Sequence, residues 1–103
     1  MVGRRRRVIW TDHARAALDD VLVYIAEESQ DGARAVLEQA LAAAEALATL
    51  SERGRVVPEL EDTTIREVFV YSYRLLYEVT DAEVHILAFL HGARDFRKWR
   101  HGD

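Results

Sequence analysis

The chain of 103 residues contains no cysteine, one proline and one lysine. The absence of cysteine excludes a disulfide framework and any metal site built on thiolates. No apolar run approaches the roughly 20 residues of a membrane-spanning helix. The basic start MVGRRRRVIW is not followed by the apolar segment of a signal peptide. We therefore expect a cytoplasmic protein of one domain, residues 1–103, with no part in a membrane.

Charge is unevenly distributed along the chain, although the formal net charge is only −4. Residues 11–52 hold nine acidic residues against two arginines. Positive charge gathers in an N-terminal arm, residues 1–6, and in a C-terminal segment, residues 93–103. The acidic first half argues against nucleic acid wrapping the whole molecule, but it leaves a local basic surface available.

Two helices are predicted after a short first strand over residues 5–10. Thr11 is a suitable N-cap, and apolar residues at helical spacing predict a helix over residues 12–28. After a polar break, Asp31 is expected to cap a second, alanine-rich helix, and Gly54 is expected to end it. A short break between two helices with apolar stripes predicts an antiparallel hairpin.

Period-two alternation of apolar residues predicts three strands, over residues 64–71, 73–80 and 83–91. Their connections have hairpin length. The last strand is apolar on both faces, so we expect it to have neighbours on both sides. One of its faces is predicted to carry Val84, Ile86, Ala88 and Leu90. Residues 93–103 are predicted to form a polar tail or a short helix.

The predicted fold belongs to the α+β class, with the order β-α-α-β-β-β. The N-terminal strand joins a small, mainly antiparallel sheet, and the antiparallel helix hairpin packs on one face of that sheet. The other face is expected to be left to solvent or a partner.

The predicted strands present isolated cations and imidazoles, namely Arg66, Arg74, Arg94, His85 and His91. Such a surface suits a polyanion or an acidic peptide, or it is simply a solvated face. Arg74 can equally pair with Glu67 or Glu78 across a hairpin. The indole of Trp99, in a charged segment, is expected to dock on its own sheet or on a partner. Glycine-rich phosphate loops and metal-ligand spacings are absent from the sequence, so we expect no cofactor and no metal.

Four segments carry a resemblance to a known family: GRVVPEL at 54–60, IRE at 65–67, YRLLYEV at 73–79 and HGARD at 91–95. In their order and spacing the chain resembles the RelE/ParE superfamily of type II toxins over nearly its whole length. The resemblance implies a toxin encoded beside an antitoxin, which binds and silences it in a hetero-oligomer. RelE-like members cut mRNA in the ribosomal A site, whereas ParE-like members poison DNA gyrase.

The resemblance also implies roles for single residues. Arg74 matches the arginine that RelE-like nucleases place at the scissile phosphate, and Arg94 matches their second arginine. His91 is the nearby residue able to move a proton. The lysines of these nucleases are missing, since Lys98 is the only lysine in the chain. A surface that recognises the target or the antitoxin is expected to include Arg66, Arg74, Arg94, Arg97 and Trp99.

The favoured reading is therefore a ParE-like toxin that inhibits growth by binding DNA gyrase. The alternative is a RelE-like, metal-independent endoribonuclease that acts with the ribosome on mRNA. A third possibility is a degenerate member that binds an antitoxin but poisons nothing.

Overall fold

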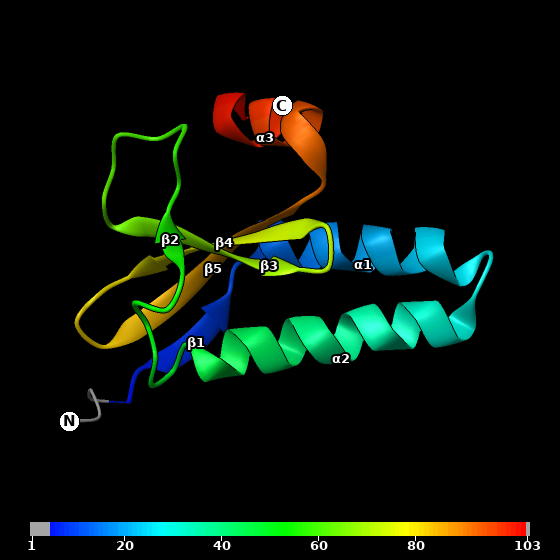
Figure 1. The fold of residues 1–103 in the computed structure, drawn as a ribbon, viewed down its shortest axis with the longest axis horizontal. Coiled ribbons are helices and arrows are strands. Elements are labelled where there is room, and N and C mark those ends of the chain that lie inside the picture. Colours follow the sequence, from blue (N-terminus) through cyan, green and yellow to red (C-terminus); the bar gives the residue numbers. More distant parts are fainter. Residues whose placement is uncertain (1–4, 103) are drawn as a thin grey trace.

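The computed structural model describes residues 5–102 (Figure 1). Most of the N-terminal arm predicted over residues 1–6 lies outside the described residues. The elements in chain order are β1 (Arg7–Trp10), α1 (Asp12–Ala26), α2 (Gln30–Ala46), β2 (Arg55–Val56), β3 (Ile65–Val70), β4 (Tyr73–Val79), β5 (Glu83–Leu90) and α3 (Gly92–His101). The two-residue strand β2, within the linker, is the element that sequence periodicity did not predict.

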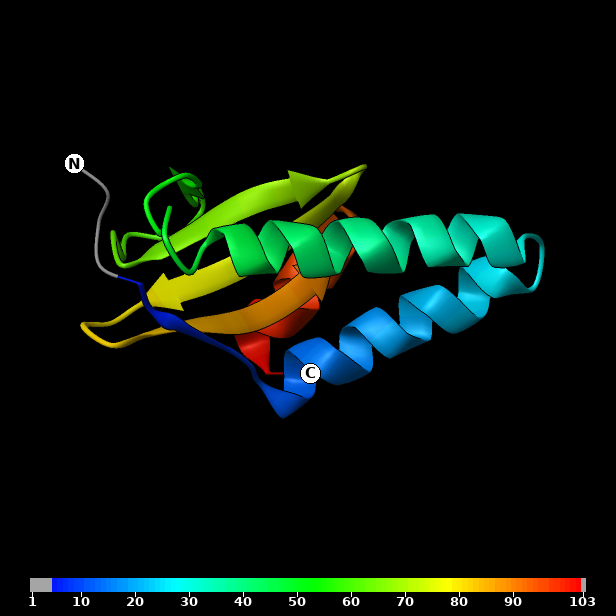
Figure 2. The same ribbon diagram turned by 90° about the horizontal axis from the view of Figure 1, so that it is seen from below.

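The strands form one sheet in the order β1-β5-β4-β3-β2. β1 runs parallel to β5 and all other pairs are antiparallel. The α+β class, the helix hairpin and the internal position of the last strand are therefore confirmed. The α1–α2 hairpin covers one face of the sheet and extends past its end (Figures 1 and 2).

The capping residue of α1 is the one predicted, whereas that of α2 is a different residue. Thr11 caps α1 as predicted, because its Oγ1 accepts a hydrogen bond of 3.1 Å from the Ala14 amide. The prediction of Asp31 as the cap of α2 is wrong. Ser29 has the extended backbone of a cap, and its Oγ accepts a 2.8 Å bond from the Gly32 amide. Asp31 lies in the first turn, where its charge favours the positive helix end.

Gly54 does not end α2, so that prediction is also wrong. The helix ends at Ala46, eight positions earlier, and the intervening chain forms turns. Gly54 is instead needed for close approach, since a Cβ atom there would lie 2.5 Å from the carbonyl oxygen of Glu67. The hydroxyl of buried Tyr77 accepts a 2.9 Å bond from the Gly54 amide and donates a 2.8 Å bond to the Ser51 carbonyl. These bonds fasten the linker to the sheet.

A register shift between Leu76 and Tyr77 leaves Leu87 of β5 without an opposite residue in β4. Such a bulge reverses the face to which the following side chains point. The single face predicted for the last strand is therefore wrong after the bulge. Val84 and Ile86 pack under the helix hairpin, whereas Ala88 and Leu90 belong to a second core on the opposite face.

The second face of the sheet is covered by α3, which corrects the expectation that it is left to solvent or a partner (Figure 1). Of the two alternatives for the C-terminal segment, the helix is the one observed. Phe96 is buried against this face and Trp99 packs beside it. Gly92 makes the sharp turn from β5 into α3 with a φ of 84°, a backbone conformation that favours glycine.

The bonds of the Tyr77 hydroxyl can be tested with Tyr77→Phe. This variant leaves a buried amide and a buried carbonyl without their partner, so we expect a loss of about 1–3 kcal/mol in the free energy of unfolding, measured in urea. Tyr73→Phe is the matched control, because the Tyr73 hydroxyl has no hydrogen-bond partner among residues 5–102. Equal stabilities of the two variants would contradict the role of Tyr77.

Candidate functional site

The centre of the second sheet face holds four charged side chains and one aromatic ring, here called the Arg74 cluster: Arg55, Glu59, Glu67, Arg74 and Phe96. Arg74 Nε donates to Glu67 Oε1 at 2.6 Å, and its terminal nitrogens donate to both carboxylate oxygens of Glu59 at 2.8 and 3.0 Å. Arg55 Nε donates to the other Glu67 oxygen at 2.7 Å. The Arg74 guanidinium also lies 4.9 Å from the centre of the Phe96 ring.

The two charged side chains at the centre of this cluster, Glu67 and Arg74, are largely buried. The Glu67 side chain is 0% exposed and that of Arg74 is 12% exposed. Hydrogen bonds from Arg74 hold the pKa of Glu59 below its ordinary value, and the Glu59 and Glu67 carboxylates raise the pKa of Arg74 above its own. Both carboxylate oxygens of Glu67 and all three nitrogens of Arg74 are engaged. The cluster therefore ties the linker, β3, β4 and α3 together.

The structure distributes the other predicted site residues over separate places. Arg66 donates a 2.8 Å bond to the Gly54 carbonyl. His91 is exposed at the end of β5, with its ring 4.8 Å from that of Tyr73. Arg94 and Arg97 are exposed on α3. Neither of them forms an ion pair with another residue of the described chain.

The contacts of Arg74 and Trp99 distinguish between the alternatives given for each residue. For Arg74 these were binding of a polyanion or acidic peptide and pairing across a hairpin, and for Trp99 they were docking on its own sheet and docking on a partner. Arg74 pairs with Glu67 as one alternative proposed, and with Glu59, which sequence reasoning missed. Trp99 packs on its own protein, with its ring 5.8 Å from that of Phe96. Neither Glu59 nor Phe96 carried a sequence signal, because they lie far from Arg74 along the chain and only the fold brings them together.

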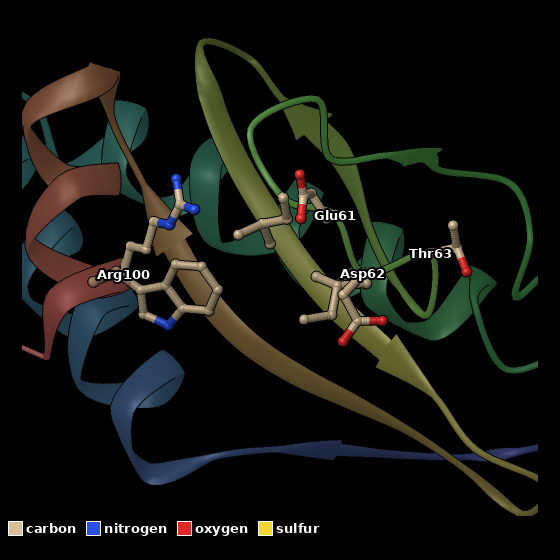
Figure 3. A pocket seen from close by; sticks show the side chains of 7 residues that line it. Glu61, Asp62, Thr63 and Arg100 are labelled. Atoms are coloured by element: carbon tan, nitrogen blue, oxygen red, sulfur yellow. The ribbon is translucent and has the colours of Figure 1, made fainter.

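An open cleft of about 800 Å³ separates α3 from the loop before β3 (Figure 3). Its apolar wall consists of Leu60, Ile65 and Trp99. Arg100 stands on the α3 side, and Glu61, Asp62 and Thr63 stand on the loop side. Glu61 and Asp62 make the loop side of the cleft acidic, and hydrogen bonds from Thr64 lower the pKa of Asp62. The cleft thus combines an apolar lining with charges of opposite sign on its two sides.

A second groove, of about 540 Å³, follows the edge strand β1 where the helix hairpin passes over it. Apolar side chains dominate its lining, namely Val8, Ile9, Trp10, Leu18, Leu37 and Leu41. Arg7, Arg15 and Asp19 form its polar rim. Sequence periodicity did not indicate this groove, because each of its residues reads as part of an ordinary apolar stripe. Its shape and lining suit apolar side chains of a protein partner.

Within residues 5–102, no group of three or more histidine and carboxylate side chains is placed to hold a metal ion. None of the helices in this part of the chain is long and apolar enough to cross a membrane.

This fold is that of small toxins from toxin–antitoxin systems. A solved chain described as the chromosomal ParDE TA system from P. aeruginosa superposes with a TM-score of 0.69 at 19% identity, covering 84% of this chain and 96% of that one. The family model of the ParE toxin of type II toxin-antitoxin system, parDE, matches residues 8–96. Toxin RelE2 of Caulobacter vibrioides is 38% identical over 89 residues, which are 85% of this chain and 97% of the relative. The chain belongs to the ParE toxin family of the RelE/ParE superfamily.

The ion pair between Glu59 and Arg74 can be tested with Glu59→Gln. Because the pKa of Glu59 is lowered in the folded protein, its contribution to stability is present above the ordinary value of 4.5 and is lost as the pH falls through the folded value. The carboxylate is partly exposed and screened by solvent, so we expect a loss of only about 0.5 kcal/mol near neutral pH.

Urea unfolding at several pH values measures this difference. The stabilities of Glu59→Gln and the parent protein should converge as the pH falls below 4.5 and passes through the lowered pKa of Glu59. Glu61→Gln is the control, since Glu61 forms no ion pair within the described residues. A gap that persists unchanged in acid would show that the charge of Glu59 is not the cause.

Proposed function

We propose that the protein is the toxin of a type II toxin–antitoxin module, and that it inhibits growth in the cytoplasm by binding DNA gyrase until a cognate antitoxin silences it. Membership of the ParE toxin family supports the first part. The observation that favours gyrase over mRNA cleavage is the engagement of Arg74 by two carboxylates.

Metal-free RNA cleavage needs cations that stabilise the charge on the reacting phosphate, together with a base and an acid. The carboxylates of Glu59 and Glu67 surround the arginine that would meet this phosphate, and their negative charge opposes phosphate binding. His91 and Arg94 alone do not complete such a set. A binding toxin does not need one, and the exposed cations of α3 are available for recognition.

The groove along β1 supports binding of an antitoxin. An amphipathic segment could bury its apolar side chains against Trp10, Leu37 and Leu41, and place carboxylates near Arg7 and Arg15 on the rim. The antitoxin and toxin would then form a hetero-oligomer.

Growth and supercoiling assays test the target. Induced expression should arrest growth, and co-expression of the protein encoded by the neighbouring gene should restore it. Purified protein should inhibit supercoiling by gyrase, and the antitoxin should relieve the inhibition. Growth arrest by a protein that leaves supercoiling unchanged at high molar excess would rule out gyrase as the target. Expression without growth arrest would favour a degenerate member that retains antitoxin binding.

The nuclease alternative is tested with His91→Ala and Arg94→Ala, two exposed positions whose side chains make no ion pair in the described chain. A gyrase-binding toxin without catalytic residues gives no mRNA cuts in a translation extract, with or without these changes. If the nuclease alternative holds, cuts appear at the ribosomal A site and each substitution lowers their rate by about a hundredfold. Arg74→Ala is less suitable, because it leaves one oxygen of the buried Glu67 carboxylate without its partner and destabilises the fold.

A further inference from the structure

The C-terminal helix α3 carries aromatic rings on one side and positive charge on the other. Its inner side holds Phe96 and Trp99, which pack on the second face of the sheet, away from the helix hairpin (Figures 1 and 2). Four exposed basic residues share the outer side at helical spacing, and they are here called the cationic stripe: Arg94, Arg97, Lys98 and His101. The helix therefore presents its positive side to the surroundings.

The stability of α3 does not account for this stripe. The helix dipole favours cations in the last turn, but Arg94 lies in the first turn, where the same dipole disfavours positive charge. No member of the stripe forms an ion pair with another residue of the range 5–102. The single acidic residue of α3, Asp95, is directed to the start of the helix, since its Oδ2 accepts a 3.0 Å bond from the His91 amide. The stripe is thus positive charge that the described fold does not use.

The outer side of α3 has the composition of a surface that contacts phosphates. Among residues 5–102, the exposed large apolar side chains belong to α1, α2 and the segment between α2 and β4, and none of them lies on α3. The centre of a protein–protein interface is built on aromatic and apolar side chains. Contacts to a nucleic-acid backbone are made by arginine and lysine instead. The stripe therefore favours a nucleic acid over a protein surface.

The length of the stripe agrees with the spacing of phosphates in duplex DNA. From Arg94 to His101 the helix rises by roughly 10 Å. One strand of B-DNA carries a phosphate about every 3.4 Å along the axis, so the stripe covers about three phosphates. His13 of α1 extends the basic surface, because it lines the same cleft of about 470 Å³ as Lys98.

We propose that the cationic stripe binds the sugar-phosphate backbone of duplex DNA without reading its sequence. The acidic helix hairpin repels DNA, so the contact is confined to the α3 side of the molecule. In the function proposed above, the toxin then contacts gyrase together with the DNA that gyrase holds, and this DNA contributes to the affinity for the target. The inference rests on the proposed function for the source of the DNA, whereas affinity for DNA is a property of α3 itself.

Fluorescence anisotropy with a labelled DNA duplex of random sequence measures this affinity in the purified protein at several salt concentrations. Three phosphates neutralised by Arg94, Arg97 and Lys98 give a slope of about −2.7 for the logarithm of the binding constant against the logarithm of the salt concentration. Arg97→Gln removes one of these charges, so the slope should become shallower by about one. Absence of binding at low salt, or tighter binding of RNA than of duplex DNA, would overturn the inference.

Arg100→Gln is the matched control. It removes the same charge from the same helix, but Arg100 lies off the stripe, in the cleft that faces Glu61 and Asp62 (Figure 3). We expect this variant to bind DNA with nearly the slope of the parent protein. Equal effects of the two substitutions would show that net charge alone attracts the DNA, and would overturn the stripe as the site. Circular dichroism checks that both variants fold.

Supercoiling assays separate this inference from the proposed function. At equal concentrations, Arg97→Gln should inhibit gyrase less than Arg100→Gln does, and equal inhibition would overturn a contribution of the DNA contact to the target. Salt-dependent DNA binding by a protein that leaves supercoiling unchanged would overturn gyrase as the target and keep the DNA site. Inhibition of supercoiling by a protein that binds no DNA would overturn the DNA site and keep gyrase.

Discussion

The buried carboxylate of Glu67 is the constraint on which the second face of this protein depends. It is fully removed from solvent and holds Arg55 on one oxygen and Arg74 on the other. An ionised carboxylate in such a place is costly unless it is paired, and loss of one partner leaves the other charge uncompensated. Arg74 carries the connection further, to Glu59 in the linker and to the ring of Phe96 in α3. Linker, sheet and C-terminal helix are therefore positioned by one set of charges.

This arrangement has a consequence for function. The arginine best placed by sequence to meet a phosphate is committed to holding the fold, so the surfaces left for recognition lie around it. They are the exposed cations of α3, the apolar groove along β1 and the uncovered end of β3. The groove along β1 offers apolar side chains and the end of β3 offers backbone groups, and both suit a protein partner. The function proposed above requires surfaces for both a target and an antitoxin.

Capping residues and apolar periodicity predicted the elements well where neighbouring residues alone decide the local structure. Thr11 caps α1 as expected, and the alternation of strands β3 and β4 survives in the sheet. The errors occurred where two neighbouring residues suited the same role, or where one residue suited two roles. Ser29 and Asp31 are both good caps, and only the backbone shows which one is extended. Gly54 resembles a helix terminator but is kept small by the carbonyl of Glu67.

The sequence by itself determined the order of the two long helices and the four longer strands, the α+β class and the family, because periodicity, capping residues and short motifs are local properties. Only the tertiary structure decided which face each residue occupies after the bulge at Leu87, and what covers the second face of the sheet. It also decided the role of Arg74, since its partners Glu59, Glu67 and Phe96 come from three other segments. Pairing between distant charges depends on burial and distance, and neither is encoded in the spacing of residues along the chain.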